Sequence, residues 1–223
     1  DMTLNLVVDN PPSSLSSLTT SLSDNVKIIQ NFLEGLVRRT VNDELEGGLA
    51  ESWEISEDGL NYTFYLKDVF WENGDPITAA DFEFAWKQVA TLKEAEQKAQ
   101  IYYLKNGKAI AKNEKDVAEL GVKAVDEKTL KVELEQPIAY FLQVIATYTF
   151  YPVQEQFYNK VGAENYGTSK DTVLSSGAYK LTSYVADSGY SFTKNDKYWD
   201  KENVAIADIK VSVVSLPETQ AIM

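Results

Sequence analysis

Cysteine and histidine are both absent from the 223 residues of this chain. Without a thiol or an imidazole, the chain cannot supply a Cys/His zinc site, a Ser-His-Asp triad or a cysteine nucleophile. The missing cysteine does not assign a compartment, because disulfide-free chains occur in the cytosol and in the bacterial envelope alike. Much of enzyme chemistry is therefore excluded, and we expect neither a cofactor nor a bound metal.

Basic residues are also scarce. Against 21 Lys and Arg stand 34 Asp and Glu, and the formal net charge of −13 repels a phosphate backbone, so nucleic acid is not an expected partner. No stretch approaches the roughly 18 apolar residues of a membrane-spanning helix. Residues 1–10 lack the basic start and apolar run of a signal peptide. The sequence predicts a soluble chain in a mature or trimmed form.

Aromatic residues, by contrast, are abundant: 13 Tyr, 9 Phe and 4 Trp make up 12% of the chain. A chain of this length buries enough surface for one or two hydrophobic cores. Phe64, Phe82 and Trp86 stand at core spacing, so we expect them inside. The aromatic residues outside clean periodicity are candidates to line a cleft: Tyr102, Tyr103, Tyr148, Phe150 and Tyr151.

The first forty residues predict a strand followed by a helix. Thr3–Val8 is an apolar run stopped by Asp-Asn-Pro-Pro. After a stretch rich in Ser and Thr, apolar residues recur at helical spacing from a cap at Ser23 or Asp24 to about Leu36. The chain is expected to change direction near Gly35.

Two β-hairpins are predicted in the middle of the chain. Residues 53–67 alternate around an Asp-Gly turn, and residues 121–135 alternate in the same way, which together indicates an antiparallel sheet. Between them, Thr78 and Asp81 have capping-box spacing ahead of a helix. Further expected elements are charged, solvated helices within 93–119, short helices from Pro137 and from Gln154, a strand pair at 178–181 and 190–193, and a last strand at 209–214.

This mixture of strands and helices without repeats indicates a mixed α/β or α+β body. Residues 215–219 have the cap, the early Pro and the acidic first turn of a helix, yet the sequence stops at Met223. We therefore expect a truncated chain whose function depends on further polypeptide.

Two motif-like features indicate no chemistry. Residues 162–169 hold the two glycines of a phosphate-binding loop, but Thr168 stands where Lys is required, so a surface loop after a helix is the better interpretation. Acidic groups at Glu72 with Asp75, and at 196–202, are expected to be solvated turns, because chance pairs are common among 34 acidic residues.

Several linked segments stand in one order along the chain: Glu-Gly-Leu at 34–36, Leu-Ala-Glu-Ser-Trp-Glu-Ile-Ser at 49–56, Trp-Glu-Asn-Gly-Asp-Pro-Ile-Thr-Ala-Ala-Asp-Phe at 71–82, Ser-Gly-Ala-Tyr-Lys-Leu at 176–181 and Asn-Asp-Lys-Tyr-Trp-Asp at 195–200. This series resembles the solute-binding proteins of oligopeptide ABC transporters, the OppA-like members of extracellular solute-binding protein family 5. The resemblance runs from about Leu4 to Met223 and rests on many segments, so it is specific.

The resemblance implies an α/β fold, namely one lobe of a type II periplasmic-binding-protein-like receptor with the second lobe absent. Residues 1–40 and 151–216 would form a hinged, mixed α/β subdomain. Residues 41–150 would form an inserted subdomain with an antiparallel sheet and helices. Residues 217–223 would begin the crossing to the missing lobe.

The same resemblance implies where a ligand binds. The implied ligand-binding residues are a loop at the first helix, two tyrosines and a segment around a Gly-Ala-Tyr sequence: Asp24, Asn25, Val26, Tyr102, Tyr103, Ser175, Ser176, Gly177, Ala178 and Tyr179. Many relatives carry Asn where Ser176 stands, so the Gly177 backbone is the expected contact to an extended peptide. In this family the groups that hold the peptide termini lie largely on the other lobe, so this chain alone is expected to bind peptide weakly or not at all.

As to function, the resemblance implies an extracytoplasmic receptor, not an enzyme, that captures oligopeptides and delivers them to an ABC transporter. Its partners would be permease subunits and cytosolic ATPases, and it would be lipid-anchored to the outer face of a Gram-positive membrane. Two alternatives stay open: a receptor for signalling peptides or another small solute within the family, and a surface adhesin or chaperone-like binder. A hydrolase is disfavoured because no nucleophile and base stand together.

Overall fold

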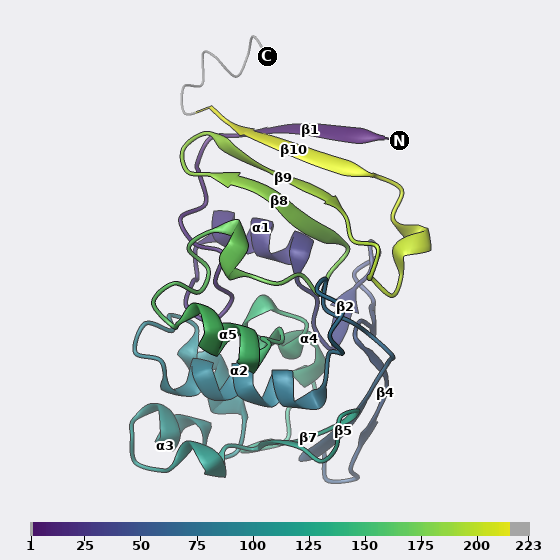
Figure 1. The fold of residues 1–223 in the computed structure, drawn as a ribbon. Helices are drawn as coiled ribbons and strands as arrows, with labels where there is room; N and C mark the ends of the chain where they lie inside the picture. Colours follow the sequence, from purple (N-terminus) through teal and green to yellow (C-terminus); the bar gives the residue numbers. More distant parts are fainter. Residues whose placement is uncertain (1, 215–223) are drawn as a thin grey trace.

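Two four-stranded sheets lie at opposite ends of the molecule, with helices between them, in a computed structural model that describes residues 2–214 (Figure 1). The strands are β1 (Thr3–Val8), β2 (Val37–Arg39), β3 (Leu45–Gly47), β4 (Ala50–Ile55), β5 (Asn61–Leu66), β6 (Val122–Ala124), β7 (Thr129–Glu133), β8 (Tyr179–Val185), β9 (Gly189–Lys194) and β10 (Asp208–Val213).

The α-helices are α1 (Ser23–Phe32), α2 (Ala79–Thr91), α3 (Gly107–Ala111), α4 (Phe141–Ile145) and α5 (Glu155–Val161). The short 3-10 helices are η1 (Lys98–Tyr103), η2 (Val117–Glu119), η3 (Tyr148–Phe150), η4 (Lys170–Thr172) and η5 (Lys201–Asn203). None of the helices in this described part is long and apolar enough to cross a bilayer.

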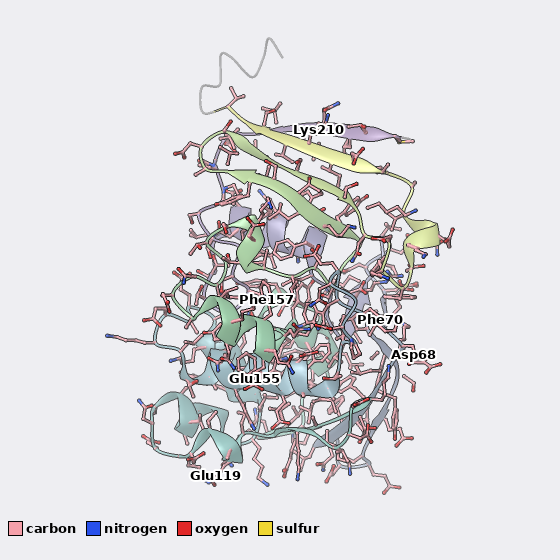
Figure 2. The ribbon with its side chains drawn as sticks, viewed as in Figure 1. Asp68, Phe70, Glu119, Glu155, Phe157 and Lys210 are labelled. Carbon is pink, nitrogen blue, oxygen red and sulfur yellow. The ribbon has the colours of Figure 1, made fainter. Side chains whose placement is uncertain are left out.

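The first sheet has the order β1-β10-β9-β8 and is built from the two ends of the described chain. β1 runs parallel to β10, and the other neighbours are antiparallel. Because side chains alternate along a strand, Ile209 and Val211 are buried while Lys210 between them is exposed. Lys210 lies on the face turned away from α1 (Figure 2). The strands predicted at 3–8, 178–181, 190–193 and 209–214 are thereby confirmed.

The second sheet has the order β4-β5-β7-β6 and is antiparallel throughout. Both predicted hairpins are present, and Gly59 takes the positive φ of +69° that the Asp-Gly turn needs. Phe64 pairs with Leu130 across β5 and β7, and both are fully buried. Helix α2 covers this buried face, since it contacts β6 and β7.

Helix α2 begins as predicted. The Thr78 side chain accepts from the backbone of Asp81, and the Asp81 carboxylate accepts from the Thr78 N–H at 2.9 Å, which completes a capping box. Phe82 and Trp86 are both fully buried, as their spacing predicted. The indole N–H of Trp86 donates to the Phe150 carbonyl at 2.9 Å, so the helix is held by a polar bond as well as by packing.

Helix α1 differs from its prediction at both ends. It ends at Phe32 rather than near Leu36, because the Phe32 carbonyl accepts from the N–H groups of Ser176 and Gly177, both at 2.9 Å. These bonds from a distant segment replace the next helical bonds, and the chain continues extended at Leu33. At its start the N-cap is Leu22, without a side-chain cap bond, rather than Ser23 or Asp24.

Other differences concern short helices. Helix α4 begins at Phe141, four residues later than the predicted start at Pro137. The region 93–119 holds the helices joined by loops that were predicted, but they are short, namely η1, α3 and η2. Gly107 explains part of this, because a Cβ there would lie 2.0 Å from the Ile101 carbonyl oxygen, so the chain folds tightly back on η1. The helix predicted at 215–219 lies outside the described residues.

Candidate functional site

Hydrogen bonds hold together three segments that are distant in sequence: the loop 20–22, the stretch 96–103 that contains η1, and the stretch 140–148 that contains α4. The Tyr148 hydroxyl donates to the Thr20 carbonyl at 3.0 Å. The Ser21 N–H donates to the Glu96 carboxylate at 2.7 Å. The Thr147 hydroxyl stands 3.1 Å from the Gln100 side-chain oxygen. These bonds give the three segments one fixed arrangement.

A hollow of about 320 Å³ opens between the second and third of these segments. Its lining holds two amides, a phenol, a hydroxyl and an aliphatic side chain, from Gln100, Tyr103, Gln143, Val144 and Thr147. We call it the neutral pocket, because no charged side chain lines it, in a chain of which 25% of the residues are charged.

Tyrosines border the neutral pocket. Tyr103 meets Tyr140 edge to face, with ring centroids 6.3 Å apart and planes at 89°. A hydrogen bond between the two hydroxyls raises the pKa of Tyr103 above its ordinary value. Tyr102 and Tyr140 are 37% and 53% exposed. Such rings offer apolar faces with a polar edge, which suits contact with varied side chains.

A second hollow of about 280 Å³ shares the 144–147 turn with the neutral pocket, through Ala146. Its lining also includes Gln30, Tyr151, Arg38 and Arg39. Arg38 and Arg39 are the only two arginines of the sequence. Arg39 pairs with the exposed Asp43 at 2.5 Å.

Arg38 is occupied within the protein. Its guanidinium binds Glu46 at 2.7 Å, Asp200 at 2.8 Å and the Tyr198 hydroxyl at 2.8 Å, and it lies 3.5 Å from Glu34. Burial raises the pKa of Glu34, although the Trp199 and Tyr198 hydrogen bonds and the Arg38 charge act in the opposite direction. This cluster around Arg38 stabilises the fold, and we assign it no ligand.

The predicted residues at the first helix divide into different roles. Asn25 is buried, and its side-chain oxygen accepts from the Ser13 N–H at 2.7 Å while its amide donates to Thr20 at 2.7 Å. Asp24 forms a surface ion pair with Lys27 at 3.0 Å. Val26 is partly buried against the core. Asn25 therefore shapes the loop that leads to the site rather than presenting a free side chain.

The predicted segment 175–179 is used to hold other elements. The Glu72 N–H donates to the Ser175 carbonyl at 2.9 Å, and the Ser175 N–H donates to the Glu72 carboxylate at 3.1 Å. The Ser176 hydroxyl accepts from the Glu34 N–H at 3.1 Å. The Gly177 N–H donates to the Phe32 carbonyl at 2.9 Å, so in this arrangement the N–H is not a free donor for the expected contact between the Gly177 backbone and a peptide.

The remaining members of that segment are also engaged. The Asn195 amide donates to the Gly177 carbonyl at 2.9 Å, and the Tyr179 hydroxyl donates to the Ile206 carbonyl at 3.2 Å. Ala178 accepts from the Asn195 N–H through its carbonyl at 2.8 Å. This segment meets the end of α1, whereas Asp24 lies at its start, so the two predicted sets do not form one pocket.

Among the aromatic candidates, Tyr103 lines the neutral pocket, and Tyr102 is exposed two positions from Gln100. The prediction that Phe150 lines a cleft is wrong, because its ring is fully buried and packs edge to face on Trp86, with centroids 5.1 Å apart. Tyr148 is 8% exposed and belongs to the core, so the prediction that it lines a cleft is wrong. Tyr151 is equally buried, yet it lines the second hollow.

The acidic groups interpreted as solvated turns need a similar correction. Glu72 accepts from the Ser175 N–H at 3.1 Å, and burial raises its pKa. Asp200 pairs with Arg38. Asp75 and Asp196 are exposed, as expected. Within residues 2–214, no group of three or more acidic side chains is arranged to hold a metal ion.

Residues 44–223 match a family model described as bacterial extracellular solute-binding proteins, family 5 Middle. The chain belongs to this family. Its fold is that of one lobe of a type II periplasmic binding protein, as the order of motif segments predicted. The family model begins just before β3, so β1 and α1 lie outside the match but inside the wider likeness to individual proteins.

Individual family members are similar over nearly the whole chain. The oligopeptide-binding protein OppA of Bacillus subtilis is 37% identical over 220 residues, which is 98% of this chain and 40% of that protein. The substrate-binding domain of an oligopeptide ABC transporter from Bacillus anthracis superposes with a TM-score of 0.93 at 40% identity, covering 97% of this chain and 42% of that one. Peptide-bound OppA of Listeria monocytogenes superposes with a TM-score of 0.93 at 33% identity, and the likeness covers 96% of this chain and 43% of that one. This family member thus spans about two-fifths of the length of these relatives.

Sequence reasoning missed most of the neutral pocket. Gln100, Gln143 and Thr147 carry no motif, and they come together only because η1 and α4 are packed side by side. The signal that pointed toward the pocket was the aromatic excess, which singled out Tyr103.

Proposed function

We propose that this chain supplies one side of a peptide-binding cleft in a transport receptor, and that the neutral pocket receives a side chain of the captured peptide. The observation that supports this most directly is the uncharged, tyrosine-bordered lining of that pocket on a fixed framework. Proteins that are similar over this region are named for binding oligopeptides and dipeptides.

The lining suits a receptor of broad specificity. A pocket without fixed charges does not demand a complementary charge, and its amides both donate and accept. The Gln143 side chain has no hydrogen-bond partner among residues 2–214, so it is available to a peptide group or to bridging water. Exposed Tyr102 and Tyr140 add apolar surface at low entropic cost.

We propose that the groups fixing the peptide termini belong to a second lobe, because this chain matches only about 40% of the length of its relatives. We also propose that 1–40 with 151–216 forms a hinged subdomain and 41–150 an inserted one. The composition of the two four-stranded sheets supports that division. The strands of one lie within residues 3–8 and 179–213, and those of the other lie within residues 50–133. Closure of two lobes on the peptide would then exclude water from the neutral pocket.

In this proposal the protein is a receptor and not a catalyst, and it hands peptides to permease subunits of an ABC transporter driven by cytosolic ATPases. We propose a location outside the cytoplasmic membrane, with a lipid anchor on its outer face in a Gram-positive cell. An anchor keeps the receptor close to its permease. Metabolic labelling of the native protein with an alkyne fatty acid tests the anchor, and the absence of label would remove it.

The test of peptide capture uses the longest natural chain that contains this sequence. Calorimetric titration with a set of unmodified peptides of two to eight residues should give saturable binding for several of them. Tyr103→Ala should weaken that binding about tenfold, which corresponds to about 1.4 kcal/mol.

Tyr65→Ala is the matched control, because Tyr65 is a partly exposed tyrosine on β5 that does not line the pocket. We expect this variant to change peptide affinity less than twofold. Equal losses in the two variants would reject the pocket as the peptide site. No saturable binding of any peptide would reject peptide capture itself.

A further inference from the structure

Another pocket, of about 530 Å³, lies apart from the neutral pocket. The loop 13–19, the turn after α2, helix α5 and the loop 163–168 enclose it. The two pockets share no lining residue. We call it the Tyr158 pocket, after the α5 residue that forms part of its lining.

The charged side chains that line the Tyr158 pocket are all acidic. Glu94 and Glu164 are both exposed carboxylates, and neither forms an ion pair within residues 2–214. They line the same pocket as Tyr158, and their charges add to burial in raising the pKa of its phenol. No lysine or arginine lines the pocket. The local field therefore favours a positive group, and the net charge of −13 acts in the same direction.

The lining also presents aromatic surface. Tyr158 and Tyr166 lie with ring centroids 5.1 Å apart and planes at 55°. Leu18 and Leu92 add aliphatic surface. Rings beside carboxylates form the kind of surroundings that attract an ammonium or guanidinium group through the ring quadrupole and the anionic charge together.

Two polar groups of this lining are unpaired. Tyr158 is 6% exposed and Tyr166 is 8% exposed, so both are more than nine-tenths buried. Neither hydroxyl has a hydrogen-bond partner among residues 2–214. The fully buried, unpaired side-chain atoms of the described residues do not include these two hydroxyl oxygens, so both oxygens keep accessible surface. A ligand with several N–H donors in the pocket would supply these two oxygens with partners.

We propose that the Tyr158 pocket binds an alkylammonium or alkylguanidinium group, either as a free amine or as the Lys or Arg side chain of a peptide. The charge would meet Glu94 and Glu164, and the alkyl stem would lie along the leucines and the tyrosine rings. A carboxylate or phosphate is disfavoured there by the same two charges. This site adds to the proposed function and does not depend on it.

The test measures binding of n-butylamine, n-butylguanidine and the neutral 1-butanol to the longest natural chain, at pH 7 and 0.15 M salt. Tyrosine ring signals in NMR spectra report the titration. We expect saturable shifts with both cations and at least tenfold weaker binding of 1-butanol. Glu94→Gln with Glu164→Gln should weaken cation binding at least tenfold, and Tyr158→Phe with Tyr166→Phe at least threefold, with unchanged melting temperature for the charge variant.

Glu155→Gln is the control for net charge, because Glu155 is an exposed carboxylate on the same helix α5 that lines a different hollow (Figure 2). It should change affinity for the cations less than twofold. A second arm compares one peptide carrying Lys with the same peptide carrying norleucine.

The outcomes separate the two sources of the cation. If the affinity for the free amines depends on Glu94 and Glu164, the natural ligand is a free amine. If only the affinity for the Lys peptide depends on them, the ligand is a peptide side chain. Binding of 1-butanol equal to that of the amines, losses in Glu155→Gln equal to those in the double variant, or no dependence in either arm would overturn the proposal. Peptides without basic residues report on the neutral pocket alone, so failure here leaves peptide capture standing.

Discussion

The indole N–H of Trp199 donates to the Glu34 carboxylate at 2.7 Å and so joins positions that are 165 residues apart. The Tyr198 hydroxyl donates to the other carboxylate oxygen at 2.7 Å. Above the Trp199 ring, the Lys67 ammonium lies 3.6 Å from the centroid. Glu34 therefore links the chain segment before β2 to the turn that follows β9. Lys67 follows β5, so it adds a contact from the second sheet.

Replacing Glu34 by Ala should lower the free energy of unfolding by about 3–5 kcal/mol. Glu34 is 8% exposed, and loss of its carboxylate leaves Tyr198, Trp199 and Arg38 without the acceptor that they share. Urea denaturation followed by tryptophan fluorescence measures the change. Glu46→Ala is the matched control, since Glu46 also binds Arg38 but its side chain is 45% exposed, and we expect less than about 1 kcal/mol. Similar costs for the two variants would show that burial of the Glu34 carboxylate does not matter.

Asp81 should make stability fall as pH rises. Burial raises its pKa to about 6, against the opposing effect of the Thr78 and Trp71 hydrogen bonds. Between about pH 4 and pH 6 the folded chain keeps a proton that the unfolded chain has released, so the free energy of unfolding decreases with pH in this range. The difference between about 6 and the ordinary 3.8 corresponds to about 3 kcal/mol.

Asp81→Asn isolates this effect from that of other carboxylates, because an Asn side-chain oxygen still accepts from Thr78 and Trp71. The stability of the variant relative to the natural chain should rise by about 3 kcal/mol between pH 3.5 and pH 7. Urea titrations at half-unit pH steps measure it. A difference that stays constant with pH would mean that Asp81 titrates alike in the folded and unfolded chains.

Local patterns predicted most of the elements, because their signals lie within a few residues. The Asp-Gly turn at Gly59 and the capping box of Thr78 and Asp81 need only neighbouring residues to form, and both are present. The end of α1 was not predictable in this way. It depends on two N–H groups near position 176 that reach the Phe32 carbonyl, a contact that no local propensity encodes.

The same distinction applies to the candidate site. Tyr103 was found because an aromatic outside helical periodicity is unusual, whereas Gln100 and Thr147 are ordinary polar residues 47 positions apart that meet through packing. Phe150 has an equally irregular position in the sequence, yet it faces Trp86 in the core. Irregular spacing indicates that a ring lies outside a regular helix or strand, and it does not indicate whether that ring faces water.

Asn25 should stabilise the loop 13–20 rather than bind a ligand directly. Asn25→Ala removes the acceptor of the Ser13 N–H and the donor to Thr20, so we expect a loss of about 2–4 kcal/mol and faster hydrogen exchange at Ser13. Asp24→Ala, which breaks only a surface ion pair, should cost less than about 1 kcal/mol. Unchanged stability of Asn25→Ala together with a loss of peptide affinity would instead make Asn25 a ligand contact.

Gly177 should be required by packing. A Cβ at this position would lie 3.0 Å from the Phe32 carbonyl carbon and 3.1 Å from backbone atoms of Leu33, and backbone atoms cannot turn aside as a side chain can. Gly177→Ala should therefore cost about 1–3 kcal/mol by separating β8 from the end of α1. Gly74→Ala provides the comparison, because Gly74 has open space around it but a φ of +92°, so its cost of about 1 kcal/mol comes from conformation alone. If Gly177 serves packing, peptide affinity measured at low temperature, where the variant is folded, should stay within about threefold of the natural chain. A large loss of peptide affinity in a variant of unchanged stability would instead show that Gly177 contacts the peptide.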